Sequence, residues 1–314
     1  MGRQAGALSR IPVAVPSPAG EGFFLPIPVD IMLQSLVDGI LLGGVYGVIA
    51  TGLSLVFGVL GVVNFAQAEF LMLGMYVAWF AWRYLGLDPL LGSVLSFIVV
   101  FVVGYLVQRL LIARVLKAPP AAQVFLTVGL LIVLENAALM LFGSDFRSVS
   151  VPYQVQGFRL GDIFVGAPYL YAFAAALFLS AALWLFLDRS WTGRAIRAVA
   201  QDPMAATLNG VDTRLTYGVA FGLGVALTAF GGAVILPYIT VSPTIGGQFV
   251  VVMFTVVVLG GLGSVAGALA GGLVVGIVQS VSTLFFPIHL QNLCLFVIFI
   301  AVLALRPQGL IKGA

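Results

Sequence analysis

SWTGRAIRAVAQDPMAATLNG, residues 190–210, is the longest polar stretch in a chain that is otherwise almost entirely apolar. Its Asp202-Pro203 pair is typical of a helix start, because aspartate accepts bonds from free backbone N–H groups and proline suits the first helical position. Its Asn209-Gly210 pair is typical of a helix end, because glycine adopts the left-handed conformation at little cost. The pattern therefore predicts a short helix over Pro203–Leu208.

A helix of this length is only marginally stable in water, so we expect it to rest against another surface. Arg194 and Arg197 are spaced so that they share one face of a helix, where they can meet acidic groups of a partner. The alternative interpretation is an ordinary loop between two membrane segments. The residues alone do not decide between the two.

The overall composition predicts an all-α polytopic membrane protein. Of the 314 residues, 61% are hydrophobic and only 8% are charged, and the mean hydropathy is +1.17. Only helix bundles and closed barrels satisfy the backbone in lipid, and the long apolar runs do not alternate as barrel strands do. The net charge of +3 comes mostly from loop arginines and does not indicate nucleic-acid binding.

We expect a bundle of about eight or nine transmembrane helices, some of them broken. The apolar segments lie at about residues 31–85, 90–110, 122–142, 169–187, 215–238, 248–286 and 290–305. Residues 1–31 are rich in proline, and we assign them as a disordered N-terminal tail, with Met32 as an alternative start. Residues 32–314 form the membrane domain.

Two of the apolar segments contain an irregular break. The first, GVLGVVNFAQAEF at residues 58–70, carries Asn64, Gln67 and Glu69, and the second, at residues 260–267, carries Ser264. The breaks match weakly at an offset of two hundred residues, and internal repeats with broken helices often flank a transporter's solute path. We interpret these four polar residues as candidates for that path, with hydrogen bonding between helices as the alternative.

The distribution of basic residues predicts the topology. Outside the tail, nine of them lie in residues 109–117, residues 189–214 and the C-terminus, and three lie elsewhere. The positive-inside rule places these three regions in the cytoplasm and the loop at residues 143–166 in the periplasm.

The sequence lacks the motifs of an enzyme. Neither of its two lysines follows a glycine, so there is no Walker A motif for nucleotide hydrolysis, and one histidine cannot form a metal cluster. We therefore expect no catalytic, cofactor-binding or metal-binding residues, and a solute pathway that is driven from elsewhere. An autonomous secondary carrier or channel, with Glu69 as its coupling residue, remains the alternative.

Four motifs resemble those of the branched-chain amino acid ABC transporter permeases. They are LGGVYGVIATGLSLVFGVLGVVNFAQAEFLMLGMY (residues 42–76), GRAIRAVAQDPMAATLNGVD (193–212), VVLGGLGSVAGALAGGLVVGIVQS (257–280) and RPQGL (306–310). The resemblance covers residues 32–312 and implies a permease subunit in the bacterial inner membrane. It also implies a second permease chain, two cytoplasmic ATPase subunits and a periplasmic solute-binding protein as partners, with branched-chain amino acids or related small solutes as substrate.

The resemblance gives the polar stretch a role as the loop that docks on the ATPase. The residues we assign to this coupling loop are Arg194, Arg197, Asp202, Pro203, Ala205, Ala206, Asn209 and Gly210. ATP hydrolysis then resides on the partner subunits, and the chain itself is not an enzyme.

Overall fold

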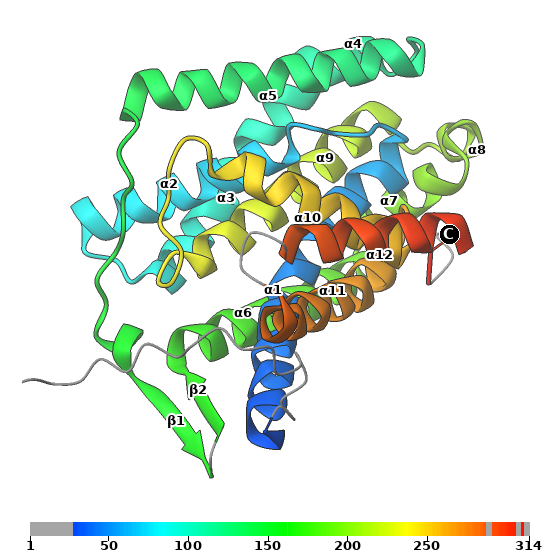
Figure 1. Cartoon of the computed structure of the whole chain (residues 1–314). Coiled ribbons are helices and arrows are strands. Elements are labelled where there is room, and N and C mark those ends of the chain that lie inside the picture. The colour runs from blue at the N-terminus through cyan, green and yellow to red at the C-terminus, as the bar shows by residue number, and fades with distance from the viewer. Residues whose placement is uncertain (1–27, 162, 287–290, 306–308, 311–314) are drawn as a thin grey trace, which may run out of the picture.

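The computed structural model describes residues 28–161, 163–286, 291–305 and 309–310 (Figure 1). Most of the expected N-terminal tail, residues 1–27, lies outside this part of the chain, as do His289 and the basic residues Arg306 and Lys312. The helices are α1 (Val29–Leu60), α2 (Gln67–Leu85), α3 (Pro89–Val107), α4 (Ala113–Val115), α5 (Pro120–Phe142), α6 (Ala167–Arg189), α7 (Trp191–Gln201), α8 (Pro203–Leu208), α9 (Thr213–Ile235), α10 (Ile245–Gly260), α11 (Val265–Phe285) and α12 (Gln291–Leu305).

The architecture is the predicted all-α membrane fold. Within the described residues, six helices are long and apolar enough to cross a bilayer, namely α1, the continuous helical run of residues 89–115, α5, α6, α9 and α11. Helices α10 and α12 are apolar but shorter. The chain is thus a multi-pass membrane protein, and the total of eight or nine crossings stays a prediction.

Both predicted breaks are present. Helix α1 ends at Leu60, Gly61 follows with a φ of 67°, and α2 begins at Gln67. Helix α10 ends at Gly260, Gly261 follows with a φ of 108°, and α11 begins after Ser264. Positive φ values are accessible to glycine at little cost, which explains why each helix ends where it does.

Helix α1 is the centre of the bundle and packs against α11 through glycines. A Cβ atom built on Gly43 would lie 2.7 Å from the carbonyl oxygen of Gly272, and one on Gly39 would lie 2.7 Å from the Cα of Ile277. Nearer the breaks, a Cβ on Gly58 would lie 2.9 Å from the carbonyl oxygen of Gly263. Small residues let two helices approach until their backbones touch, so that dispersion contacts hold them together in lipid.

Two local features were not predicted from the sequence. Residues Gln108–Ile112 form a π-helical turn between α3 and α4. The polar loop after α5 contains a 3₁₀ turn (Pro152–Val155) and an antiparallel hairpin of β1 (Gly157–Leu160) and β2 (Ile163–Gly166). The hairpin is attached to α1, because the side chain of Gln34 bonds both the carbonyl oxygen (2.7 Å) and the backbone N–H (2.8 Å) of Phe164.

The remainder of this loop is clamped onto the bundle. The backbone of Arg147 pairs with that of Val241, and its guanidinium lies 4.6 Å from the ring centroid of Trp79. The Tyr153 hydroxyl donates to Asp88 at 3.0 Å, and burial together with the Asp88 carboxylate raises the pKa of this tyrosine above its ordinary value.

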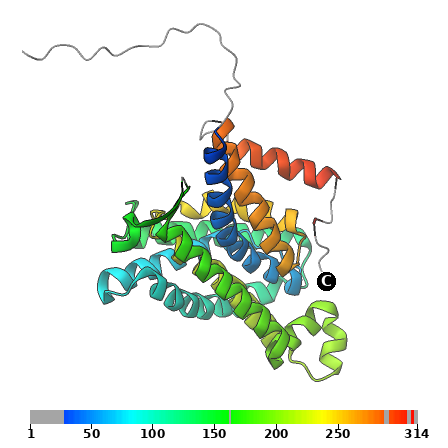
Figure 2. The same ribbon diagram turned by 90° about the horizontal axis from the view of Figure 1, so that it is seen from below.

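The bundle has two distinct ends. The hairpin end carries β1, β2 and the start of α1, and the α8 end carries α7, α8 and residues 309–310, where the N–H of Leu310 bonds the carbonyl of Leu259. The two ends lie on opposite sides of the molecule in both views (Figures 1 and 2). This separation fits the predicted topology, with the hairpin end in the periplasm and the α8 end in the cytoplasm.

The first prediction tests this orientation. Ser148 at the hairpin end and Thr207 at the α8 end are both exposed, so cysteines introduced there should react with aqueous maleimides. In a Cys294→Ala background, we expect an impermeant maleimide added to intact cells to label Ser148→Cys only. Thr207→Cys should react only after permeabilisation. Labelling of both variants from the same side would contradict the assigned topology.

Candidate functional site

The short helix α8 forms where the sequence predicts it. The Oδ1 atom of Asp202 accepts hydrogen bonds from the N–H groups of Met204 (2.8 Å) and Ala205 (2.9 Å). Gly210 follows the helix with a φ of 83°, and the side chain of Asn209 donates to the Ala205 carbonyl at 2.8 Å. Both ends of α8 are therefore fixed by local bonds despite its length.

Helix α8 rests on its own chain along one face only. Ala206 is buried, and its carbonyl accepts a bond from Val211 at 3.1 Å. On the other face, Met204 and Leu208 are 75% and 80% exposed. The expectation of a supporting surface is thus met in part by α7 and the start of α9, and two large apolar side chains remain uncovered within this chain.

Helix α7 connects α6 to α8 and is strongly amphipathic. The Ser190 hydroxyl caps it by accepting from the Gly193 N–H at 2.8 Å. Its apolar side, with Ile196 and Val199, is buried against the bundle. Gly193 permits a close turn, because a Cβ there would lie 2.4 Å from the carbonyl oxygen of Phe186 in α6. The arginines Arg194 and Arg197 are carried on this helix.

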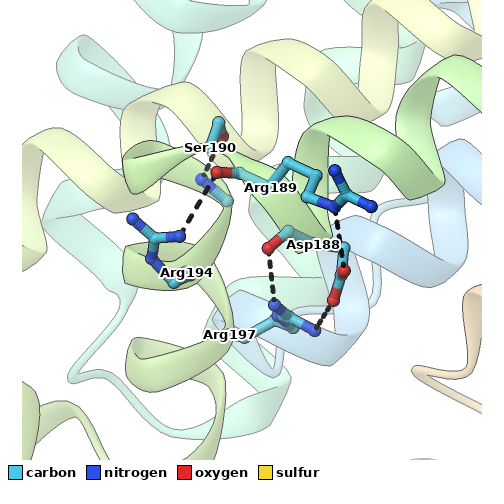
Figure 3. Close-up of polar contacts among 6 residues, drawn as sticks. Asp188, Arg189, Ser190, Arg194 and Arg197 are labelled. Carbon is cyan, nitrogen blue, oxygen red and sulfur yellow. Dashed lines mark hydrogen bonds and ion pairs between the residues drawn. The ribbon is translucent and has the colours of Figure 1, made fainter.

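The two arginines bond to the end of α6 (Figure 3). Arg197 forms an ion pair with Asp188 at 3.2 Å, and Arg194 donates to the carbonyl oxygen of Arg189 at 3.2 Å. Asp188 was not among the residues singled out from the sequence. The arginines were expected to meet acids of a partner, and the structure shows that Arg197 already has an acid in its own chain, although half of its side chain is exposed.

A cavity of about 660 Å³ lies between α6 and α7 on one side and α1 and α11 on the other. Its wall is mostly apolar, with Leu55, Trp184 and Leu269 among its members. Asp188, Arg197 and Ser264 also line it. The structure thus brings one residue of the predicted solute path, Ser264, to the same cavity as the ion pair beside the polar segment.

The polar residues of the first break, in contrast to Ser264 of the second, are buried away from this cavity. Asn64 donates to Gln67 at 2.9 Å, and the Gln67 amide donates to the hydroxyl of Thr228 (2.7 Å) and to the carbonyl of Gly224 (3.1 Å) in α9. The side chains of Asn64, Gln67 and Thr228 are fully buried. The bonds of Gln67 connect two helices, as in the alternative interpretation, and they fix the start of α2 against the middle of α9, whereas the Asn64 bond is local and orients the Gln67 side chain.

Glu69 occupies the first turn of α2 and faces the first turn of α10. Its side chain is 1% exposed, and a Cβ built on Gly246 would lie 2.3 Å from the Glu69 Oε1 atom. Its Oε2 atom has no hydrogen-bond partner among the described residues. Glu69 thus lies at the amino ends of two helices, each of which carries partial positive charge.

Comparison with known proteins identifies the family of this chain. The sequence model of the family described as branched-chain amino acid transport system / permease component matches residues 35–303. The chain belongs to this family. The branched-chain amino acid permease family thereby accounts for the apolar helices and for the motifs noted above.

Similar proteins cover almost the whole chain. The high-affinity branched-chain amino acid transport system permease protein BraD of Pseudomonas aeruginosa is 31% identical over 294 residues, which are 89% of this chain and 95% of BraD. Its counterpart LivH of Escherichia coli K12 is 30% identical over 298 residues, with the same two coverages of 89% and 95%.

A permease with a differently named solute is also similar. The fructose import permease protein FrcC of Rhizobium meliloti is 28% identical over 283 residues, covering 80% of this chain and 76% of FrcC. No solved structure matches the chain.

Proposed function

We propose that this chain is a membrane-spanning subunit of an ATP-driven importer in the bacterial inner membrane. In this proposal it pairs with a second permease chain and receives its solute from a periplasmic binding protein. Two cytoplasmic ATPase subunits supply the energy. The observation that carries the proposal is α8, a short helix with fixed ends that presents Met204 and Leu208 outward at the end of the bundle predicted to be cytoplasmic.

The contacts of α8 suit the transmission of movement. Large exposed apolar side chains on a rigid element are typical of the centre of a protein interface. Helix α8 is joined through α7 to the end of α6, where Asp188 binds Arg197 beside the 660 Å³ cavity. A displacement of α8 by an ATPase would therefore reach the wall of that cavity through one short helix and one ion pair.

Branched-chain amino acids are the proposed substrates. Six of the similar permeases are named for branched-chain amino acid transport, whereas the similar FrcC is named for fructose. The proposed solute path passes through the 660 Å³ cavity, where Ser264 and its neighbours in the second break line it. Asn64 and Gln67 do not line this cavity, and they shape the path by holding α2 in place. Glu69 does not line it either, and it lies against Gly246 of α10.

The second prediction tests the energy source. Proteoliposomes that contain the permease pair, the ATPases and the binding protein should take up radiolabelled leucine only with ATP on the ATPase side. A catalytically inactive ATPase should abolish uptake, and proton or sodium gradients should not restore it. Uptake by the permease alone along an ion gradient would favour the autonomous carrier, for which the buried and incompletely bonded Glu69 carboxylate is the supporting observation.

A further inference from the structure

A second cavity lies at the hairpin end of the bundle, far from the polar segment. It measures about 330 Å³, is partly open, and is lined by residues of α1, α11, the start of α6 and strand β2. Its lining includes Asp38, Gln34, Gln279, Ser280 and Tyr169. This volume falls within the range of small-molecule sites, and none of the residues assigned to the coupling loop or to the solute path lines the cavity.

Two acceptor groups distinguish this cavity, the Asp38 carboxylate and the Gln279 Oε1 atom. The Asp38 carboxylate accepts from the Gln34 side chain at 3.0 Å on each oxygen, and no arginine or lysine of the described chain pairs with it. Gln34 uses its remaining capacity on Phe164 of the hairpin. The Gln279 Oε1 atom is buried without a hydrogen-bond partner in the described structure. A ligand that pairs with these two groups donates hydrogen bonds, and a positive charge on it complements the Asp38 carboxylate.

Another part of the wall is apolar and aromatic, and the hydroxyl residues Ser280 and Thr283 complete it. Leu42 and Phe164 line it together with the ring of Tyr169, which stacks on Tyr238 with ring centroids 4.2 Å apart. A bare divalent cation would need about six oxygen ligands, and no group of three or more acidic, histidine or cysteine side chains suited to a metal occurs in the described residues. An organic ammonium with an aliphatic portion matches both halves of the cavity, and aromatic rings also attract such cations.

We propose that this cavity binds the ammonium group of a small organic solute, with Asp38 as its counter-ion. If the proposed function holds, the solute is the transported amino acid itself, and this last assignment rests on that function. It would be held on the periplasmic side by its α-ammonium group before it passes into the bundle. Gln34 then has a positioning role, because it orients the Asp38 carboxylate and attaches the hairpin that covers the cavity.

The third prediction tests the cavity by chemical protection. In the Cys294→Ala background, the assembled transporter carrying Ser280→Cys should react with an impermeant maleimide added from the hairpin side. We expect 3-methylbutylamine and leucine at millimolar concentration to slow this labelling. We expect 4-methylpentanoate, which has the carbon skeleton of leucine without the ammonium group, to leave the rate unchanged.

Two variants of Asp38 test its role as the counter-ion. Asp38→Asn removes the charge but keeps an acceptor for Gln34, and it should weaken protection by 3-methylbutylamine about tenfold, as expected for a lost charged hydrogen bond. Asp38→Glu should restore part of the protection. Asp30→Asn, at an exposed position on the same helix, is the matched control and should leave protection unchanged.

The outcomes separate this proposal from the proposed function. Equal protection by the amine and the carboxylate, protection that persists in Asp38→Asn, or a thiol of the Ser280→Cys variant that stays unreactive would each overturn the ammonium site, even if ATP-driven leucine uptake is normal. If the transporter carries another solute, the amine should still protect. In that case the site would stand, and its assignment to an amino acid would fail.

Discussion

Gly272→Val is expected to prevent stable folding of the permease. A Cβ at this position would lie 2.3 Å from the backbone nitrogen of Gly47 and 2.4 Å from its Cα. Neither atom belongs to a side chain that can rotate away, so α1 and α11 must separate along their length. Overpacking of a well-packed core typically costs about 1–3 kcal/mol, and we expect a loss of about 3 kcal/mol or more where two backbones are forced apart.

The measurement is the yield and thermal stability of monodisperse protein after detergent extraction. Gly129→Val is the matched control, because Gly129 lies within the apolar helix α5 and a Cβ there would meet no atom within 4 Å. Gly272→Ala already introduces the conflicting atom and should fall between the two. If Gly272→Val matches Gly129→Val in yield and melting temperature, then α1 and α11 do not depend on this close contact.

The local features of the fold were predictable because their signals are local. Asp202-Pro203 and Asn209-Gly210 define α8 through bonds that reach only a few residues along the chain. The same holds for the breaks at Gly61 and Gly261, where positive φ values end the helices. Long apolar runs specify membrane helices in the same way, since the bilayer fixes their length and composition.

The contacts between distant segments were not predictable from such signals. The sequence does not indicate that Gln67 reaches Thr228 in α9, or that Glu69 faces Gly246 in α10, because these contacts depend on how the helices pack. Asp188 was missed for a similar reason. It lies at the end of α6, and it meets Arg197 only because the capped turn at Ser190 redirects α7.

The hairpin does have a local signal in the sequence. Residues 157–166, GFRLGDIFVG, place short runs rich in apolar residues on both sides of Gly161-Asp162, which is typical of two strands joined by a tight turn. The sequence carries no signal for which face of α8 points outward, because six residues are too few to show a periodicity. That face is determined by the packing of Ala206 against the rest of the chain, which leaves Met204 and Leu208 on the exposed side.

The double variant Asp202→Ala, Gly210→Val is expected to uncouple transport from ATP hydrolysis while the permease still folds. Alanine at the helix start removes two hydrogen bonds and costs about 1 kcal/mol. Valine at a φ of 83° costs about 1–2 kcal/mol more through backbone strain alone, because a Cβ there meets no atom within 4 Å. A combined loss of about 2–3 kcal/mol lowers the population of the native α8 more than tenfold.

Neither position lies in a membrane helix, so insertion and membrane abundance should match the parent. Leucine uptake should fall about tenfold or more, and the ATPase subunits of the proposed importer should co-purify poorly. Asp202→Asn, Gly210→Asn is the matched control: asparagine caps helices as well as aspartate does and tolerates the left-handed conformation. We expect it to retain most of the uptake, because it alters the same two positions without removing the cap or straining the backbone. If the Ala/Val variant binds the ATPases and takes up leucine as the parent does, then residues 190–210 are only a connecting loop.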